Sequence, residues 1–378
     1  MEFRDLKTQY KVLKDDIDKA CEEVMLNCNF ISGKQVEELE KELAEYVGVK
    51  HCVTCANGTD ALSLALMSWN IGKGDAVFVP DFTFFASGEV VSHIGATPIF
   101  VDVDKDSFNI CPKKLEKAIL KIKEEGKLTP KVIVAVDLFG LPADYKEIRK
   151  IADKYGLFIL EDGAQGFGGE QDGKKACSFG DISTTSFFPA KPLGCYGDGG
   201  AVFTNDDNIC ELLKSYRVHG KGSMKYDNVR IGVNSRLDTI QAAILKIKLR
   251  AFKDYELKDV NEVSKKYTKA LKDIVKTPVI KDGFYSSYAQ YTLTLESREI
   301  REGLQAFLKD NGVPTMIYYP KPMHEQKAFD YLDYKGEDFE NTNMLCDCVL
   351  SIPMHPYLKD EDIDFVADKI KEFFSGRK

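Results

Sequence analysis

The segment SFFPAKPLGCYGDGG, residues 186–200, places one lysine, Lys191, between a strand-like run and a series of glycines. The residues on both sides of Lys191 are apolar, and no charged residue is nearer in sequence than Asp181 before it and Asp198 after it. An amine that loses hydration in such surroundings becomes a better nucleophile, which is the condition for a Schiff-base lysine. The alternative is a lysine that lays its stem along an apolar turn and keeps its ammonium group in solvent.

The overall composition is typical of a soluble enzyme. Of 378 residues, 44% are hydrophobic and 30% are charged, and the net charge of -8 disfavours nucleic-acid binding, which requires a basic surface. The chain lacks an apolar run long enough for a bilayer and a signal-peptide pattern at its start, so we expect a cytoplasmic protein that binds no membrane. Ten cysteines fit free thiols in a reducing compartment, and the lone CxxC pair of Cys52 and Cys55 predicts no metal site.

Apolar, β-branched runs alternate with amphipathic segments along the first part of the chain. This pattern predicts an α/β fold with a mostly parallel sheet that is buried on both faces. The predicted strands are residues 51–55, 76–80, 97–101, 132–137, 158–161, 182–187 and 201–204. The predicted helices between them include residues 32–46, 59–68, 112–125 and 145–155.

The second part of the chain has a different pattern. Sustained helical periodicity over residues 235–271 predicts a long helix that leads away from the sheet. Residues 288–295 and 315–318 are predicted as strands, and residues 300–311 and 360–374 as helices. We therefore expect a large domain, residues 1–250, and a smaller C-terminal α+β domain, residues 251–378, because a single core rarely grows to the size of this chain.

A turn between a predicted strand and helix has the composition of a phosphate site. Residues 56–62 read Ala-Asn-Gly-Thr-Asp-Ala-Leu, so Gly58 and Thr59 offer backbone amides and a hydroxyl at a helix N-terminus. The turn also lies at the carboxyl end of a strand, where ligands bind in open α/β sheets. The alternative is that the Gly-Thr pair is an ordinary helix cap, as it is in many helices.

Two other strand ends carry residues that suit a planar, phosphate-bearing pyridine aldehyde. One buried strand ends in Glu161 and Asp162, and a carboxylate beside a pyridine nitrogen keeps that nitrogen protonated, so that the ring accepts electrons. We favour Asp162 for this role, with capping of the following turn as the alternative. The aromatic run over residues 82–85 offers a ring to stack on the cofactor, or simply packs in the core.

Together these strings resemble the DegT/DnrJ/EryC1/StrS family of sugar aminotransferases, which are pyridoxal-phosphate enzymes of the aspartate-aminotransferase fold, type I. The resemblance extends over nearly the whole chain. Its most specific blocks are residues 186–200 and residues 232–238, which read Gly-Val-Asn-Ser-Arg-Leu-Asp. The resemblance implies that fold for this chain and pyridoxal 5'-phosphate as its cofactor.

The resemblance also implies roles for the residues that match. Lys191 would attach the cofactor and later act as general acid and base. Asp162 would pair with the pyridine nitrogen, and Gln165 would hydrogen-bond the phenolic oxygen. Two positions depart from the usual family pattern, because Gly163 stands where Ala is frequent and Tyr318 where His is frequent. Because of the second departure, the resemblance does not fix which residues contact the substrate.

Further implied contacts concern the phosphate and the ring of the cofactor. Gly58, Thr59 and Ser186 would hold the phosphate, and Phe84 would lie against the ring. Asn234 would reach the phosphate in the neighbouring subunit. The resemblance therefore implies a homodimer with shared active sites.

The substrates implied are L-glutamate as the amino donor and a nucleotide-linked keto sugar as the acceptor. The strings are most similar to the branch that acts on UDP-2-acetamido-2-deoxy-3-oxo-glucuronate for bacterial surface polysaccharide, including lipopolysaccharide. Arg230 is a candidate for a bidentate ion pair with the carboxylate of a uronate, and the alternative is an ordinary surface arginine. Tyr319 and His324 are further candidate substrate contacts, and His219 and Lys221 lie in a loop predicted near the nucleotide diphosphate.

Several alternatives differ in substrate or in class. The acceptor could be another keto sugar, such as a 4-keto-6-deoxy UDP- or dTDP-sugar. A sugar dehydratase of the same fold would have His in place of Lys191, and a non-catalytic regulator that binds the cofactor would carry a basic DNA-binding module, which the sequence lacks. An NAD-dependent sugar enzyme would need the dinucleotide fingerprint that residues 166–171 fail to match.

Overall fold

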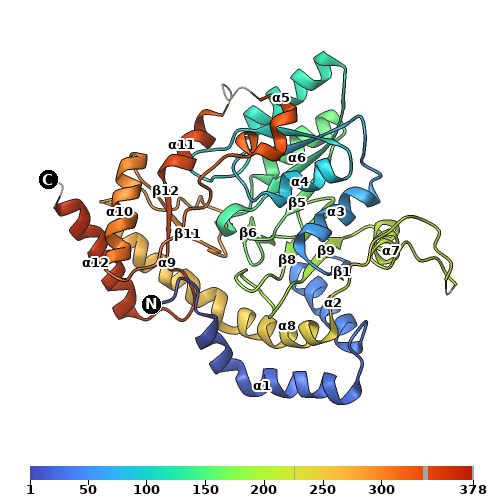
Figure 1. Cartoon of the computed structure of the whole chain (residues 1–378), viewed down its shortest axis with the longest axis horizontal. Coiled ribbons are helices and arrows are strands. Elements are labelled where there is room, and N and C mark those ends of the chain that lie inside the picture. The colour runs from blue at the N-terminus through green and yellow to red at the C-terminus, as the bar shows by residue number, and fades with distance from the viewer. Residues whose placement is uncertain (225, 335–338, 377–378) are drawn as a thin grey trace.

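The computed structural model describes residues 1–224, 226–334 and 339–376, and its centre is a seven-stranded sheet in the order β1-β9-β8-β5-β4-β2-β3 (Figure 1). β9 is antiparallel to both neighbours, and the other pairings in this sheet are parallel. The strands are β1 (His51–Cys55), β2 (Asp75–Pro80), β3 (Thr97–Val101), β4 (Thr129–Val136), β5 (Phe158–Asp162), β8 (Ile182–Ser186) and β9 (Gly200–Thr204). The predicted α/β fold with a mostly parallel sheet is confirmed.

Helices cover both faces of this sheet because both sets of alternating strand side chains are apolar. In β2, Val77 and Val79 pack in one core with the first group of helices, whereas Ala76 and Phe78 pack in another with α5 and α6. The first group is α3 (Gly58–Ser68), α4 (Ala86–His93) and α7 (Asp207–Tyr216). The opposite face carries α2 (Lys34–Val47), α5 (Pro112–Glu125), α6 (Tyr145–Tyr155) and α8 (Thr239–Ala251).

The long helix predicted after residue 235 is present as one run. It consists of α8, a π-helical turn η2 (Phe252–Glu256) and α9 (Leu257–Leu271). It passes residue 250 without a break, and the proposed domain boundary there stays a prediction. Beyond it, a two-stranded sheet of β11 (Tyr291–Thr294) and β12 (Val349–Ile352) shares a core with α9, α10 (Arg298–Asp310) and α12 (Asp360–Ser375).

The predicted strand over residues 315–318 is wrong. Met316 makes a single antiparallel bridge to Ser351, and the partner of β11 is β12 instead. Pro314 and Pro320 flank the segment, and proline offers no amide hydrogen to a strand ladder. Ile317 and Tyr318 pack against the core of the large sheet, so their apolar character reflects packing.

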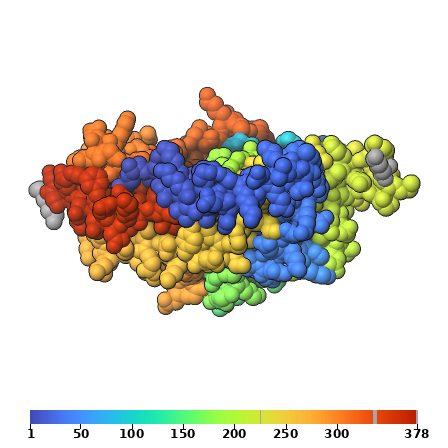
Figure 2. Space-filling model, turned by 90° about the horizontal axis from the view of Figure 1, so that it is seen from below, coloured from blue at the N-terminus to red at the C-terminus, as the bar shows by residue number. Residues whose placement is uncertain are grey.

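The sequence interpretation also missed the N-terminal helix α1 (Leu6–Asn27), which begins at the side-chain cap of Asp5 and lies along α8 (Figure 2). None of the helices in the described ranges is long and apolar enough to cross a membrane. The remaining elements are β6 (Glu170–Gln171), β7 (Lys174–Lys175), β10 (Phe284–Tyr285), α11 (Glu340–Cys348), η1 (Leu138–Gly140), η3 (Met323–Glu325) and η4 (Lys327–Leu332).

Candidate active site

The carboxyl ends of the parallel strands open onto a cavity of about 680 Å³. Its lining combines residues from strand ends, from the N-terminus of α3 and from the connection between β8 and β9. The predicted site residues that line it are Gly58, Thr59, Phe84, Asp162, Gln165, Ser186, Lys191 and Tyr319. Residues far apart in the sequence therefore meet at one edge of the sheet.

Lys191 lies on the irregular connection between β8 and β9, where its amide donates to the carbonyl of Phe188 at 2.9 Å. Within the described part of the chain, its amine has no carboxylate at ion-pair distance. Burial lowers the pKa of the Lys191 amine, Asp162 opposes that shift, and the charge of Arg4 adds to it. Lys191 therefore gives up its proton more readily than a solvated lysine.

Asp162 ends β5 and is buried. Its Oδ2 accepts a hydrogen bond from Ser87 Oγ at 2.8 Å, and its Oδ1 accepts one from the amide of Ala164 at 3.2 Å. Burial raises the pKa of the Asp162 carboxyl, while these hydrogen bonds and the charge of Lys191 oppose the rise. A carboxyl group with these partners has a fixed orientation, and its raised pKa means that it holds a proton more readily than a solvated carboxyl group.

The turn before α3 leaves backbone amides open to the cavity. Asn57 Oδ1 accepts from the amide of Asp60 at 2.8 Å, whereas the amides of Gly58 and Thr59, at the first two helical positions, have no intrahelical acceptor. A Cβ atom at Gly58 would lie 2.7 Å from the Cβ of Ser186, so the turn and the end of β8 approach too closely for a side chain. The site therefore presents amides and hydroxyls together, which suits an anion.

Gln165 and two aromatic rings form another wall. Gln165 Oε1 accepts from the amide of Phe139 at 2.8 Å, and its Nε2 donates to the hydroxyl of Tyr319 at 3.1 Å. The rings of Phe84 and Tyr319 lie 6.3 Å apart at a tilt of 42°, and Phe84 is 54% exposed. An exposed ring at the cavity edge has a free face for a planar ligand.

Other predicted contacts do not lie in this cavity. The Arg230 guanidinium donates to Ser215 Oγ and lies over the ring of Tyr216, with 5.7 Å to its centroid. His324 is buried beside Asp81, with 2.6 Å between Nδ1 and Oδ2. The predicted residues placed outside the cavity lining of this chain are His219, Lys221, Arg230, Asn234 and His324.

Several residues that line the cavity, or contact a residue that lines it, were not predicted from the sequence. Ser87 orients Asp162, Asp198 lines the cavity, and Gln290 lines it with a buried Oε1 that accepts no hydrogen bond from a described residue. Arg4 donates to the carbonyl oxygen of Lys191 at 2.9 Å. The available signals were the place of Asp198 inside the specific block of residues 186–200 and that of Ser87 shortly after the aromatic run, whereas Arg4 and Gln290 lie outside the motifs described above.

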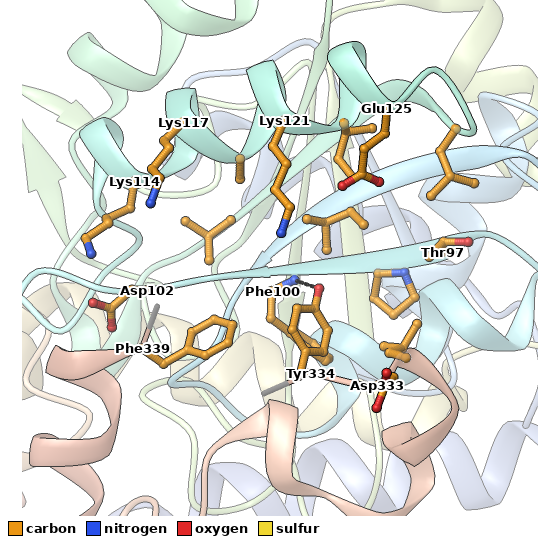
Figure 3. Close-up of a pocket in the computed structure, with 17 residues that line it drawn as sticks. Thr97, Phe100, Asp102, Lys114, Lys117, Lys121, Glu125, Asp333, Tyr334 and Phe339 are labelled. Atoms are coloured by element: carbon orange, nitrogen blue, oxygen red, sulfur yellow. Dashed lines mark hydrogen bonds between the residues drawn. The ribbon is translucent and has the colours of Figure 1, made fainter. Parts of the chain in front are cut away.

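A second cavity, of about 490 Å³, lies between edge strand β3 and α5, with Tyr334 and Phe339 on its other side (Figure 3). Lys114, Lys117 and Lys121 point toward it from α5. It contains none of the predicted site residues.

The family comparison agrees with the geometry of the first cavity. The model of the DegT/DnrJ/EryC1/StrS aminotransferase family matches residues 11–371, nearly the whole chain. This chain belongs to that family. Lys191, Asp162 and Gln165, predicted from the family resemblance, lie together in the first cavity of this family member.

Three curated relatives match this aminotransferase-family chain along its length. The UDP-2-acetamido-2-deoxy-3-oxo-D-glucuronate aminotransferase of Pseudomonas aeruginosa is 43% identical and covers 97% of this chain and 98% of its own. A pleiotropic regulatory protein of Geobacillus stearothermophilus is 40% identical, and the match covers 98% of this chain and 97% of that protein. The UDP-N-acetyl-3-dehydro-alpha-D-glucosamine 3-aminotransferase of Acidithiobacillus ferrooxidans is 38% identical, and the match covers 98% of this chain and 97% of that protein.

Solved structures share the whole fold. A DegT DnrJ EryC1 StrS aminotransferase from Brucella abortus has a TM-score of 0.96 and 48% identity, and the alignment covers 99% of both chains. NtdA from Bacillus subtilis, with bound cofactor PMP, has a TM-score of 0.89 and 27% identity over 99% of this chain and 83% of NtdA. The fold predicted for this family is thereby confirmed.

Proposed function

We propose that this protein is a pyridoxal-phosphate-dependent aminotransferase that moves the amino group of L-glutamate onto UDP-2-acetamido-2-deoxy-3-oxo-glucuronate. The observation that carries the proposal is the meeting of Lys191 and Asp162 in one cavity with the open amides of α3. An amine that readily loses a proton, a buried carboxyl group and an anion site are the three groups that this cofactor requires.

The residues of the cavity fit pyridoxal phosphate. When bound, this cofactor supplies an aldehyde that takes up an amino group and a ring that accepts electrons. Asp162 would hold the proton of the ring nitrogen, and Gln165 would donate to the phenolic oxygen from the Nε2 that contacts Tyr319. Gly58, Thr59 and Ser186 would hold the phosphate, and Phe84 would cover the ring.

Lys191 would carry protons during the reaction. Its amine is tethered in the cavity and is not held by an ion pair among the described residues, so it can move between neighbouring atoms. Its lowered pKa favours the neutral amine, the form that accepts a proton from a substrate carbon. Lys191 would therefore be both the attachment residue and the general acid and base.

We further propose a homodimer in which Asn234 completes the cavity of the partner subunit. In this chain Asn234 is exposed and outside its own cavity, and it belongs to the segment that follows α7. That segment projects from the body of the protein and exposes apolar side chains, including Met224 at 70% and Ile231 at 90% (Figure 1). Exposed apolar side chains of this size are typical of an interface.

The acceptor is inferred from similarity and from one side chain. Two of the three curated relatives act on UDP-linked 2-acetamido 3-oxo sugars by name. Arg230, next to the Asn234 segment, would bind the carboxylate of a uronate across the same subunit interface. The product would serve bacterial surface polysaccharide. All ten cysteines are free thiols, which suits an enzyme of the cytoplasm.

The test is a substrate panel. The protein is incubated with pyridoxal phosphate, L-glutamate and UDP-, dTDP- or GDP-linked keto sugars, and products are identified by mass and NMR. We expect amination of the UDP-linked 3-oxo uronate, with at least about tenfold weaker turnover of the 3-oxo sugar that lacks the carboxylate. Lys191→Ala is the matched control without activity.

Three outcomes would contradict the proposal, the third in its substrate alone. Turnover of simple keto acids but of no keto sugar would exclude the sugar acceptor. Spectroscopic binding of pyridoxal phosphate without turnover of any amino donor would favour a non-catalytic regulator, the class suggested by the name of the Geobacillus relative. Preferred turnover of a 4-keto-6-deoxy sugar would retain the enzyme class and change the substrate.

A further inference from the structure

Arg4 lies next to the main chain of Lys191, although 187 positions separate them in sequence. Its Nη2 donates to the carbonyl oxygen of Lys191 at 2.9 Å and to that of Pro192 at 3.4 Å. No other described side chain donates to these two carbonyls. The N-terminal segment thus contacts the connection that carries the cavity lysine.

The position of Arg4 is itself fixed on both sides. The carbonyl of Phe3 accepts a hydrogen bond from the amide of Met354 at 3.2 Å, which ties the segment to the C-terminal part of the chain. Asp5 caps α1 by accepting from the amide of Thr8 at 2.8 Å. Residues 3–5 are therefore held in place, which fixes the main chain of Arg4 next to the Lys191 connection.

The charge of Arg4 is not neutralised by an ion pair. In the described ranges, no carboxylate lies within 4.0 Å of its guanidinium. The carboxylate that acts most strongly on Arg4 is Glu256, which is buried and accepts hydrogen bonds from Gln9 at 2.8 Å and from Tyr357 at 2.5 Å. Because an arginine keeps its charge in proteins, a positive charge persists behind Lys191.

We propose that Arg4 is a positioning residue for the reaction, whose guanidinium fixes the main chain of Lys191 and whose charge, without an ion-pair partner among the described residues, favours the unprotonated Lys191 nitrogen. The inference rests on the proposed function, because it concerns the lysine that would attach the cofactor. Arg4 does not line the cavity, so it acts through Lys191 and does not contact substrate.

Other charged groups surround the pair and must be held constant in a test. Asp162 acts on Lys191 with the opposite sign from Arg4. The titratable groups that line the cavity with Lys191 are Asp60, Asp162, Asp198, Tyr318 and Tyr319. Those linked electrostatically to Arg4 are Lys248, Glu256, Tyr318, His355 and Tyr357.

The experiment is a pH titration of the visible absorption band of the enzyme loaded with pyridoxal phosphate, in which the midpoint reports the proton on the Lys191 nitrogen. Arg4→Gln removes the charge and keeps an N–H donor, whereas Arg4→Lys keeps the charge. We expect the midpoint of Arg4→Gln to rise by about half to one pH unit and that of Arg4→Lys to stay near the wild-type value. Arg298→Gln, at an exposed ion pair with Glu302, is the control.

The outcomes separate the inference from the proposed function. If Arg4→Gln titrates at the wild-type midpoint, or Arg4→Lys shifts as much as Arg4→Gln, the inference is wrong. If the wild-type protein shows no cofactor band that depends on Lys191, the proposed function fails first. Should Arg4→Gln not fold, Arg4→Met and Arg4→Lys provide the same comparison, and a wild-type midpoint in Arg4→Met would equally overturn the inference.

Discussion

The two large cavities differ in how they present lysines. In the first, one lysine with a lowered pKa lies near a buried carboxyl group and the open end of α3. In the second, Lys114, Lys117 and Lys121 project from successive turns of α5, whose opposite side packs in the core (Figure 3). Lys117 and Lys121 are exposed to solvent.

The difference shows that residue type alone does not identify a chemical site. The spacing of the three lysines on α5 is that of a solvated helix face. One carboxylate that lines the second cavity serves structure, since Asp102 Oδ1 accepts from the amide of Thr342 at 2.9 Å at the start of α11. What distinguishes Lys191 is an amine whose pKa is lowered by burial, in a cavity whose open amides and aromatic ring suit an anion and a planar group.

The largest expected effect concerns the two kinds of lysine. Lys191→Ala should lower transamination on the order of 10³-fold or more and abolish covalent cofactor attachment, because the proton carrier and attachment point are lost. Lys114→Ala, in the second cavity, should keep wild-type turnover. Steady-state kinetics and absorption spectra of both variants check this, and wild-type turnover in Lys191→Ala would refute the assignment.

The next effect compares carboxyl groups of the two cavities. Asp162→Asn should lower kcat by about 10²- to 10³-fold, because an amide cannot hold the ring nitrogen protonated. Asp333→Asn, at the exposed end of the second cavity, should leave kcat unchanged. The measurement is steady-state kinetics with L-glutamate as the amino donor. Equal rates for the two variants would remove Asp162 from the mechanism.

A smaller effect is expected from the residue that orients Asp162. The hydrogen bond from Ser87 lowers the pKa of the Asp162 carboxyl, so its loss in Ser87→Ala should raise that pKa further. Because the carboxylate is the active form, the acid limb of the pH profile of kcat should move to higher pH. At pH values on that limb, kcat should fall by about 2- to 10-fold. A pH profile of kcat checks this, with Ser87→Thr as the variant that retains the hydroxyl. An unchanged acid limb in Ser87→Ala would show that this hydrogen bond does not tune Asp162.

The smallest effect concerns the ring at the cavity edge. Phe84→Ala should weaken retention of pyridoxal phosphate by about 2- to 10-fold, because one stacking partner is lost while the other contacts remain. Phe365→Ala, an exposed ring on α12, is the control. Equilibrium dialysis of both variants gives the comparison, and equal retention would place Phe84 outside the cofactor contacts.

The strand ends explain why much of the site was predictable. Asp162 and Ser186 end two neighbouring, buried strands that run parallel to each other. The carboxyl ends of parallel strands lie at the same edge of a sheet, independently of the conformation of the connecting loops. Lys191 follows on the next connection, so its approach to Asp162 follows from topology. The same alternation of apolar runs predicted the central sheet, because burial on both faces leaves a strong pattern.

The parts that were missed depend on contacts between distant segments. Arg4 and Ser87 acquire their roles only from the fold, through bonds to Lys191 and Asp162. The segment with Met316 has the apolar character of a strand. Met316 nevertheless makes only an isolated bridge to Ser351, whose strand, β12, pairs with β11. Asn234 and Arg230 lie outside the cavity of their own chain. Their predicted contacts with the partner subunit rest on the family resemblance and stay predictions.

The most direct test of the central claim is to trap the bond between the cofactor and the protein. The enzyme loaded with pyridoxal phosphate is reduced with borohydride, digested and analysed by mass spectrometry. We expect one stoichiometric modification, on Lys191, and none on the lysines of the second cavity. Modification of Lys114, Lys117 or Lys121 in place of Lys191, or no reducible bond, would contradict that claim.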